Sequence, residues 1–463
     1  MPIHEDRLFP AESGARAIAK ALYARVKNLP IISPHGHTQA AWFAKNEPFP
    51  DPAKLLVQPD HYVYRMLYSQ GVSLEDLEIG RPELKDPRKV WKIFARNYYL
   101  FRGTPTRIWM EYVFQEVFGI HQRFSESTAD LFFDTISEKL KTPEFLPRAL
   151  YERFNLEVLS TTDSPLDSLA EIQALRSSGW KGKILPAFRP DPVVDPEFAG
   201  FSESILKLGE QNGEDSSTWT GYLNALRKAR LRFKELGCTS TDHGHLTAQT
   251  ADLPTAKAAE LFNKVFTGKA DAAQQVLFQA QMLTEMAQMS LEDGLVMQIH
   301  PGSVRNHNPK VYEKYGRDVG CDIPQAADYV HALRPLLNRF GNESKLTIIL
   351  FTLDESTYSR ELAPLAGHYP CLRLGPAWWF HDSPEGMMRF RQQVTETAGF
   401  YNTVGFNDDT RAFLSIPARH DVARRVDCAF LAKLVTEHRL DEDEAFEVAH
   451  ELTYGLVKKA YRL

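Results

Sequence analysis

The chain of 463 residues has a hydrophobic fraction of 43% and a charged fraction of 25%, which is ordinary for a globular protein with a sizeable core. Its net charge of −6, with both signs interspersed, argues against nucleic acid or a membrane surface as a partner. Four scattered cysteines, a polar start and no long apolar run predict a soluble cytoplasmic protein without a disulfide framework or a zinc knuckle.

The first motif with chemical content follows the first apolar run. A helix predicted over residues 14–29 leads into the run Leu29 to Ile32, which is followed by His35 and His37. In an extended strand these two imidazoles project to the same side and can bind one divalent metal ion. A motif this short also fits two polar histidines in a loop after a buried strand. The rest of the chain has to decide between these interpretations.

Two long stretches of the chain have a helical pattern. The first, from about 40 to 150, is broken by prolines and is rich in aromatic residues that suit a core. The second, from about 200 to 290, is more polar. No linker-like composition separates the first stretch from the residues after it. We therefore expect a single domain over residues 1–463 with helical insertions at about 40–150 and about 200–290.

Eight short apolar runs alternate with helical segments. They lie at 29–32, 156–163, 183–191, 236–244, 294–302, 346–352, 372–379 and 403–409. Alternating strands and helices imply parallel pairing, and eight such units predict an α/β fold, a (β/α)8 barrel enlarged by the helical insertions. The competing fold is a doubly wound open sheet, but no glycine-rich phosphate loop follows the first run.

Polar, ionisable or aromatic residues follow seven of these runs. In a barrel the carboxyl ends of the strands form one face, which is where active sites lie. The first and eighth strands are neighbours there, so Asp409 can reach a metal ion held by His35 and His37. Two imidazoles and a carboxylate with an open position suit one catalytic Zn²⁺, while Mn²⁺, Co²⁺ and Fe²⁺ stay open.

Some of the residues at the strand ends also have structural interpretations. We interpret Asp163 as the N-cap of the helix that follows it. Asp242 with His243 fits a hydrogen-bonded structural pair as well as a functional role. His300 could be a satisfied core histidine.

Several motifs, in order along the chain, resemble the uronate isomerase (glucuronate isomerase) family of the amidohydrolase superfamily. The resemblance extends from about residue 15 to 430. The motifs are PHGH at 34–37, DHYVYRM at 60–66, TTDSPLDSL at 161–169, FRPD at 188–191, STDHG at 240–244, QIHPGSVRNHN at 298–308, AWWFHD at 377–382 and NDDTRAFLS at 407–415. The resemblance implies a (β/α)8 fold, one divalent metal ion and the aldose–ketose isomerisation of hexuronic acids.

The resemblance also implies roles for individual residues. His35, His37 and Asp409 become the metal ligands, and Asp409 and Tyr62 become the candidates for proton transfer. The residues expected to bind the substrate or to lie beside the metal are His61, Arg189, His300, Trp378 and Arg411. The substrate would be D-glucuronate, D-galacturonate or both, and the sequence leaves that choice open, as it does the formation of a homo-oligomer.

The residue types suit this chemistry independently. Moving a proton between C2 and C1 needs a base, an acid and an electrophile that stabilises an enediolate. The alternative is a metal-dependent hydrolase of the superfamily that the chain resembles. Binuclear hydrolases there usually have a lysine on the fourth strand or a histidine at the end of the sixth. A mononuclear site is favoured here, because 236–244 contains no lysine and 346–352 ends without a histidine. A sugar-binding protein without catalysis would not need metal ligands together with an acid/base pair.

Overall fold

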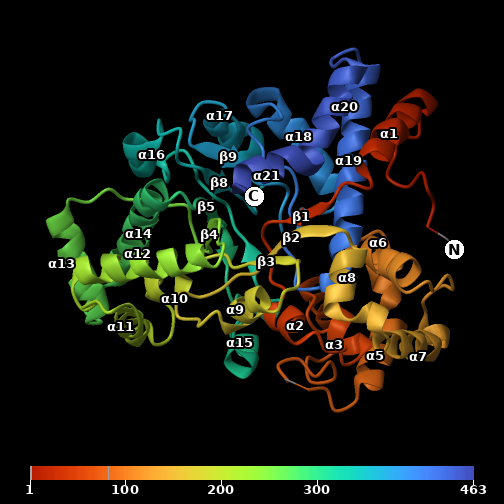
Figure 1. Ribbon diagram of the computed structural model, residues 1–463, viewed down its shortest axis with the longest axis horizontal. Coiled ribbons are helices and arrows are strands. Elements are labelled where there is room, and N and C mark those ends of the chain that lie inside the picture. Colours follow the sequence, from red (N-terminus) through yellow and green to blue (C-terminus); the bar gives the residue numbers. More distant parts are fainter. Residues whose placement is uncertain (1–2, 82) are drawn as a thin grey trace.

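The computed structural model describes residues 3–81 and 83–463 (Figure 1). Its strands are short and pair in parallel, apart from one small hairpin. One sheet has the order β1 (Ile31–Ser33), β2 (Leu156–Ser160) and β3 (Lys183–Leu185). The other has the order β4 (Ser240–His243), β5 (Val296–Ile299), β8 (Ile348–Leu350) and β9 (Leu372–Leu374). The α/β class with parallel strands is therefore confirmed.

Single bridges connect these sheets to each other and to the last predicted strand. Phe188 bridges to Asp163 on one side and to Thr241 on the other, and Leu374 bridges to Thr403. The run at 403–409 contributes no further ladder, and within residues 3–81 and 83–463 the named sheets do not form one closed ring. An antiparallel pair, β6 (Ser303–Val304) with β7 (Ile323–Pro324), was not expected from the sequence.

The region from 40 to 150 is helical, as the sequence predicts. Its helices are α2 (Ala40–Lys45), α3 (Pro52–Leu56), α4 (His61–Ser69), α5 (Pro87–Arg96), α6 (Pro105–Tyr112), α7 (Ala129–Leu140) and α8 (Pro147–Arg153). Prolines start several of them, because the missing amide of proline costs nothing at that position. The side chains of Asp51, Asp86 and Thr104 cap α3, α5 and α6 by accepting hydrogen bonds from backbone amides.

The region from 200 to 290 is also mainly helical, but β4 lies inside it. Its helices are α11 (Phe201–Asn212), α12 (Trp219–Glu235), α13 (Thr255–Phe266) and α14 (Ala272–Asp293). The other helices are α1 (Ser13–Val26), α9 (Ala170–Ser177), α10 (Asp191–Val194), α15 (Pro309–Tyr315), α16 (Arg334–Phe340), α17 (Ala363–Ala366), α18 (Pro384–Ala398), α19 (Ile416–Thr436), α20 (Glu442–His450) and α21 (Leu456–Tyr461). No helix in the described ranges is both long and apolar enough to cross a membrane.

Helix α19 is buried over most of its length, with α1, α18 and α20 packed against it (Figure 1). Several of its buried residues are charged, so each needs a partner. Asp427 accepts two hydrogen bonds from Arg391, at 2.6 and 3.1 Å. Arg419 donates to Asp382 at 2.7 Å. The helix therefore joins neighbouring elements through ion pairs as well as apolar contacts.

The interior between the strands is filled partly by α21. Val457 and Tyr461 pack with strand residues such as Ile32 and Ile349. Tyr461 is fully buried, and its hydroxyl donates to Oε1 of Gln298 at 2.8 Å.

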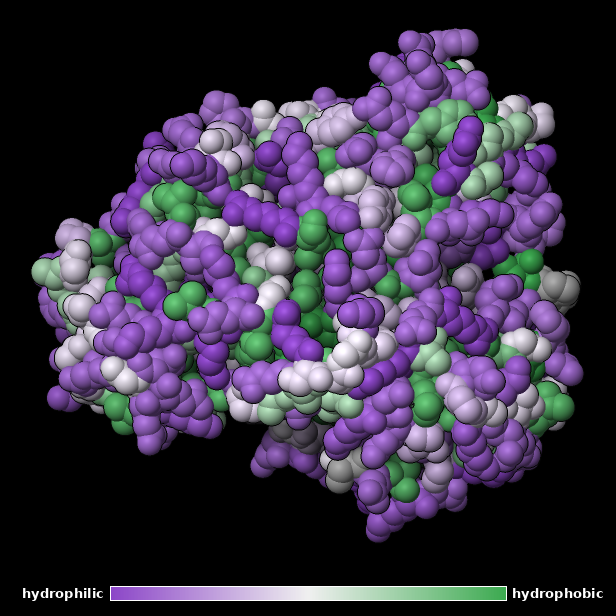
Figure 2. All heavy atoms as spheres, viewed as in Figure 1, coloured by the Kyte–Doolittle hydropathy of each residue, from purple (hydrophilic) through white to green (hydrophobic). Residues whose placement is uncertain are grey.

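The face of the molecule in Figure 2 is mostly hydrophilic, with hydrophobic residues gathered near its middle.

Replacing Tyr461 with alanine should lower the free energy of unfolding by about 3–5 kcal/mol, because it leaves a cavity the size of an aromatic ring. Denaturant unfolding followed by circular dichroism measures the change. Tyr99 is 53% exposed and provides the control, since Tyr99→Ala should cost little. Equal destabilisation by the two variants would contradict the interior role of α21.

Candidate active site

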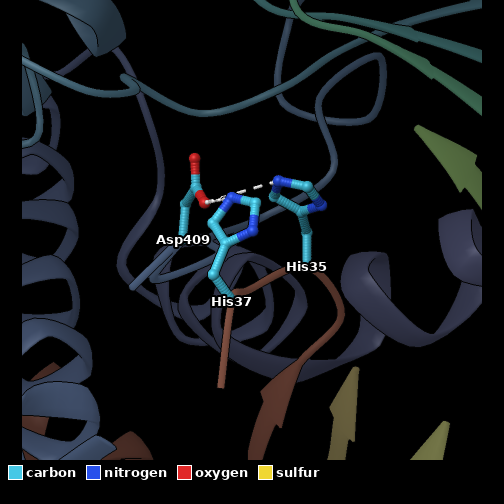
Figure 3. A group of neighbouring side chains, drawn as sticks. All are labelled: His35, His37 and Asp409. Atoms are coloured by element: carbon cyan, nitrogen blue, oxygen red, sulfur yellow. Dashed lines mark ion pairs between the residues drawn. The ribbon is translucent and has the colours of Figure 1, made fainter. Parts of the chain in front are cut away.

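The predicted metal ligands meet at the carboxyl end of β1. Nε2 of His37 lies 3.1 Å from Oδ1 of Asp409, and Nε2 of His35 lies 3.4 Å from the same oxygen (Figure 3). The backbone amide of His37 donates to the carbonyl of Thr410 at 3.1 Å, which holds the two segments together. Asp409 has a φ of +38°, a backbone conformation that is uncommon for a residue with a side chain and often marks a functional site.

The residues of this His-His-Asp group fit a metal ion. Their candidate ligand atoms all lie within 4.8 Å of one another. Oδ1 of Asp409 is buried, and neither imidazole forms a hydrogen bond of good geometry to it despite the short distances, which is costly for a carboxylate unless a cation lies nearby. Burial disfavours the charged form, but the imidazoles of His35 and His37 hold the pKa of Asp409 well below its usual range. Three ligands of this kind are typical of a catalytic metal site with an open position.

The second oxygen of Asp409 and the ring of His300 are held by aromatic side chains. The indole of Trp378 donates to Oδ2 of Asp409. His300 stacks between His35 and Phe351, with ring centroids 4.6 and 3.9 Å away. Nε2 of His300 is buried and receives no partner from the described residues. His300 is thus one part of a packed polar site.

Asp242 pairs with Arg189 and His300 instead of His243. Its Oδ2 accepts from Nη1 of Arg189 at 2.8 Å, and its Oδ1 lies 2.7 Å from Nδ1 of His300. His243 contacts Thr241 at 3.0 Å. The structural pair between Asp242 and His243 considered from the sequence is therefore wrong. His35, Asp242 and His300 also bring candidate ligand atoms within 4.8 Å, but both oxygens of Asp242 already have partners.

All nine residues that the sequence assigns to the site line one cavity of about 830 Å³. They are His35, His37, His61, Tyr62, Arg189, His300, Trp378, Asp409 and Arg411. Helix α4 therefore brings two residues of the 40–150 region to the cavity. The cavity also has Arg305, Arg317, Asp318 and Arg419 in its wall.

Tyr62 lies at the start of α4, where the carboxylate of Asp60 caps the helix by accepting from the amide of Tyr62 at 2.9 Å. Its hydroxyl donates to Oδ1 of Asp382 at 2.6 Å and accepts from the amide of Phe380 at 2.6 Å. Burial, followed by the charge of Asp382, raises the pKa of Tyr62 well above its usual value. The hydroxyl is therefore protonated near neutral pH.

His61 and Arg411 lie on the wall of the cavity beside Asp318. Burial and then the charge of Arg411 lower the pKa of His61 to about 3, so its imidazole is neutral near pH 7. Nη2 of Arg411 lies 3.6 Å from Oδ2 of Asp318, and the Arg411 side chain is 38% exposed. This guanidinium has donors left for a ligand, whereas that of Arg189 is already bound by Asp191 and Asp242.

The interpretation of Asp163 as a helix N-cap is wrong. Helix α9 begins at Ala170 and its N-cap residue is Leu169. Asp163 instead extends the ladder of β2, because its amide donates to the carbonyl of Ala187 at 2.9 Å. Its carboxylate accepts from Thr161 at 2.6 Å and lines the cavity, and burial raises its pKa to about 6.

Sequence reasoning missed Arg317, Asp318 and Arg419. The first two lie in the segment between β6 and β7, where no apolar run drew attention to them. Arg419 lies in α19, and the signal that could have revealed it is the cluster of charged residues in a helix buried on all sides. Such charges need partners, and Asp382 is one of them.

Fold and site together define an α/β enzyme with a candidate metal centre, and comparison with known proteins makes this specific. A family model described as glucuronate isomerase matches residues 12–461. The chain belongs to the glucuronate isomerase family, which confirms both the resemblance and the expectation of an isomerase.

The individual relatives cover almost the whole chain. The uronate isomerase of Rhizobium meliloti is 63% identical over 465 residues, which cover 100% of this chain and 99% of that protein. The uronate isomerase of Rhizorhabdus wittichii is 62% identical over 461 residues, which cover 100% of this chain and 98% of that protein. A crystal structure of glucuronate isomerase from Caulobacter crescentus has a TM-score of 0.98 and 59% identity, and the match covers 99% of this chain and 97% of that one.

Proposed function

We propose that this enzyme interconverts D-glucuronate with D-fructuronate, or D-galacturonate with D-tagaturonate, or that it acts on both pairs. The observation that carries the proposal is that all nine residues assigned from the sequence and the family resemblance line one cavity, in a chain that belongs to this family. A hydrolase of the same superfamily remains the alternative, but the relatives at about 60% identity are isomerases.

The proposed fold is a closed (β/α)8 barrel in a single domain with helical insertions at about 40–150 and about 200–290. The bridges at Phe188 and Leu374 support this order of strands, and the bond from His37 to Thr410 supports closure between the first and last strands. We further propose the cytoplasm as the compartment, since all four cysteines are free thiols. Neither the proposed fold nor the proposed compartment depends on whether the protein is a monomer or a homo-oligomer.

We propose that His35, His37 and Asp409 hold one divalent ion, and that Zn²⁺ suits this donor set best, ahead of Mn²⁺, Co²⁺ and Fe²⁺. When bound, such an ion polarises the substrate oxygens and stabilises negative charge that develops on them. The carboxylate of Asp409 is ionised and is oriented by Trp378, so it can take up a proton from the substrate.

The side chains of the cavity supply the remaining parts of the reaction. Proton transfer between C2 and C1 needs a base, for which Asp409 and Tyr62 are the candidates. Asp409 suits this step better, because its carboxylate is ionised whereas the hydroxyl of Tyr62 is protonated near neutral pH. A second proton has to move between the sugar oxygens, and the hydroxyl of Tyr62 is suited to that step. Arg411 has free donors that can bind the uronate carboxylate in a two-pronged contact. His61, Arg189, His300 and Trp378 complete the proposed substrate site.

Proton NMR of the metal-loaded enzyme with each hexuronate in D₂O tests the function directly. Signals of the ketose should appear, and exchange of deuterium at C1 or C2 should show how the proton moves. If neither D-glucuronate nor D-galacturonate changes, the proposed function is wrong.

Replacing Arg411 with lysine should reduce activity by about tenfold or more, because an ammonium group cannot reproduce the two-pronged contact of a guanidinium. The melting temperature should stay close to that of the parent, since Arg411 is partly exposed. Steady-state kinetics measure the effect, and Arg389→Lys is the control, because Arg389 is 46% exposed, does not line the cavity and should keep parental turnover when replaced. Parental kinetics for Arg411→Lys would remove Arg411 from the carboxylate site.

A further inference from the structure

A short series of buried polar contacts connects Tyr62 to Arg419, both in the cavity wall, through Asp382. The hydroxyl of Tyr62 donates to Oδ1 of Asp382 at 2.6 Å. Oδ2 of Asp382 accepts from Nη1 of Arg419 at 2.7 Å. Helix α4, the segment after β9 and helix α19 each contribute one member. Because these elements are far apart in the sequence, the series connects the 40–150 region to the strands and to α19.

Arg419 is fixed on several sides. Its guanidinium lies over the ring of Trp109, 3.6 Å from the centroid, and its Nε donates to the hydroxyl of Ser415 at 3.1 Å. Arg419 is 3% exposed, and Asp382 is 7% exposed. A buried cation held in this way stabilises a carboxylate beside it and fixes the direction of its oxygens. Asp382 therefore has a fixed orientation toward Tyr62.

The five-residue segment 378–382 contacts both candidates for proton transfer. At one end the indole of Trp378 donates to Asp409. In the middle the amide of Phe380 donates to the hydroxyl of Tyr62 at 2.6 Å, and Phe380 has a φ of +67°. At the other end Asp382 accepts a hydrogen bond from that hydroxyl. This segment thus fixes the positions of the Asp409 carboxylate and the Tyr62 hydroxyl relative to each other.

We propose that Asp382, held by Arg419, is the residue through which Tyr62 exchanges its proton during turnover. The inference rests on the proposed function. When the oxygen of Tyr62 takes a proton from a substrate hydroxyl, that O–H bond breaks and a new Tyr62 O–H bond forms. The original proton of Tyr62 passes to Oδ1 of Asp382. Tyr62 then donates its new proton to the other sugar oxygen, where a new O–H bond forms, and as that Tyr62 O–H bond breaks the proton on Asp382 returns to Tyr62. No proton is gained or lost over the cycle.

The environment of Tyr62 favours a coupled transfer. Burial and the charge of Asp382 raise the pKa of Tyr62 well above its usual value, so a free tyrosinate would be costly in this position. A carboxylate at 2.6 Å removes the need for one, because the hydroxyl never has to lose its proton before it receives another. Asp382 acts through Tyr62 and is a positioning residue in this sense.

The test is a double-mutant cycle on the full-length, metal-loaded enzyme. Asp382→Asn keeps the size and one accepting oxygen of the side chain but cannot take up the proton. We expect kcat to fall by roughly thirtyfold or more with KM within about threefold, because only the proton-transfer step is impaired. Combined with Tyr62→Phe, the same substitution should slow the enzyme by no more than about threefold further, since both changes affect one unit.

A matched control is available in α19, the helix that carries Arg419. Asp427 forms a buried pair with Arg391 in which it accepts two hydrogen bonds, and neither residue lines the cavity. Asp427→Asn should lower the melting temperature and leave kcat within about twofold of the parent, as expected for a purely structural pair. Asp382→Glu keeps a carboxylate and should recover part of the turnover that Asp382→Asn loses.

The outcomes separate the two proposals. Parental kcat in Asp382→Asn, or a full multiplicative loss in the double variant, would overturn the role of Asp382. If Asp382→Asn does not fold, Asp382→Glu replaces it in the cycle, and a full multiplicative loss when Tyr62→Phe is added to that variant would overturn the coupling. A parent enzyme that isomerises neither hexuronate would instead overturn the proposed function, and the role of Asp382 with it.

Discussion

Replacing Asp409 with asparagine should reduce turnover by about a thousandfold or more and remove most of the bound metal, because one carboxylate is both a metal ligand and a proton-transfer group. Oδ1 of Asp409 faces Nε2 of His35 and of His37, and an amide oxygen in that position carries no negative charge. Elemental analysis of the purified variant and steady-state kinetics measure the two effects.

The neighbouring residue provides the control for this variant. Asp408 is also buried, but its Oδ2 contacts His420 at 3.0 Å and it is outside the His-His-Asp group. Asp408→Asn should therefore retain its metal. Parental metal content and turnover in Asp409→Asn would show that the group is not the metal site.

Replacing Tyr62 with phenylalanine should reduce turnover by roughly a hundredfold, the usual range for the loss of an acid/base group. Metal content should be unchanged, because Tyr62 is not in the His-His-Asp group. The loss of the hydrogen bonds to Asp382 and Phe380 should lower the free energy of unfolding by about 1–3 kcal/mol. Kinetics, elemental analysis and thermal unfolding together separate a catalytic from a structural effect.

Tyr64 is the matched control, since it lies on the same helix and its hydroxyl donates to the carbonyl of Asp318 at 3.2 Å. Tyr64→Phe should keep nearly parental turnover. If Tyr62→Phe also kept full turnover, Asp409 would be the only remaining candidate for proton transfer.

The sequence was sufficient to predict the parallel strands and those residues of the cavity that follow them. Short apolar runs that alternate with helices pair in parallel, and their carboxyl ends lie on one side. For this reason His35, Arg189, His300 and Asp409 could be grouped without coordinates. Tyr62 lies outside the strands, and only the family resemblance assigned it to the site.

The sequence could not predict which polar residues bind each other. The order of residues allows Asp242 to pair with its neighbour His243, yet Asp242 binds Arg189 and His300 from other strands. Asp163 was interpreted as a cap from its position before a helical pattern, but the chain continues as a strand ladder to residue 163. Contacts between distant segments depend on strand order and register, which local patterns do not encode.

The His-His-Asp group has a consequence for how the protein is made. Its two histidines leave the ribosome hundreds of residues before its aspartate, so the nascent chain cannot complete the group until almost all of it has been synthesised. An ion that binds only the completed group favours the native state by mass action. Chelation should therefore weaken the contact between the first and last strands most strongly, and hydrogen exchange in the metal-free enzyme should rise first at β1 and at residues 403–410.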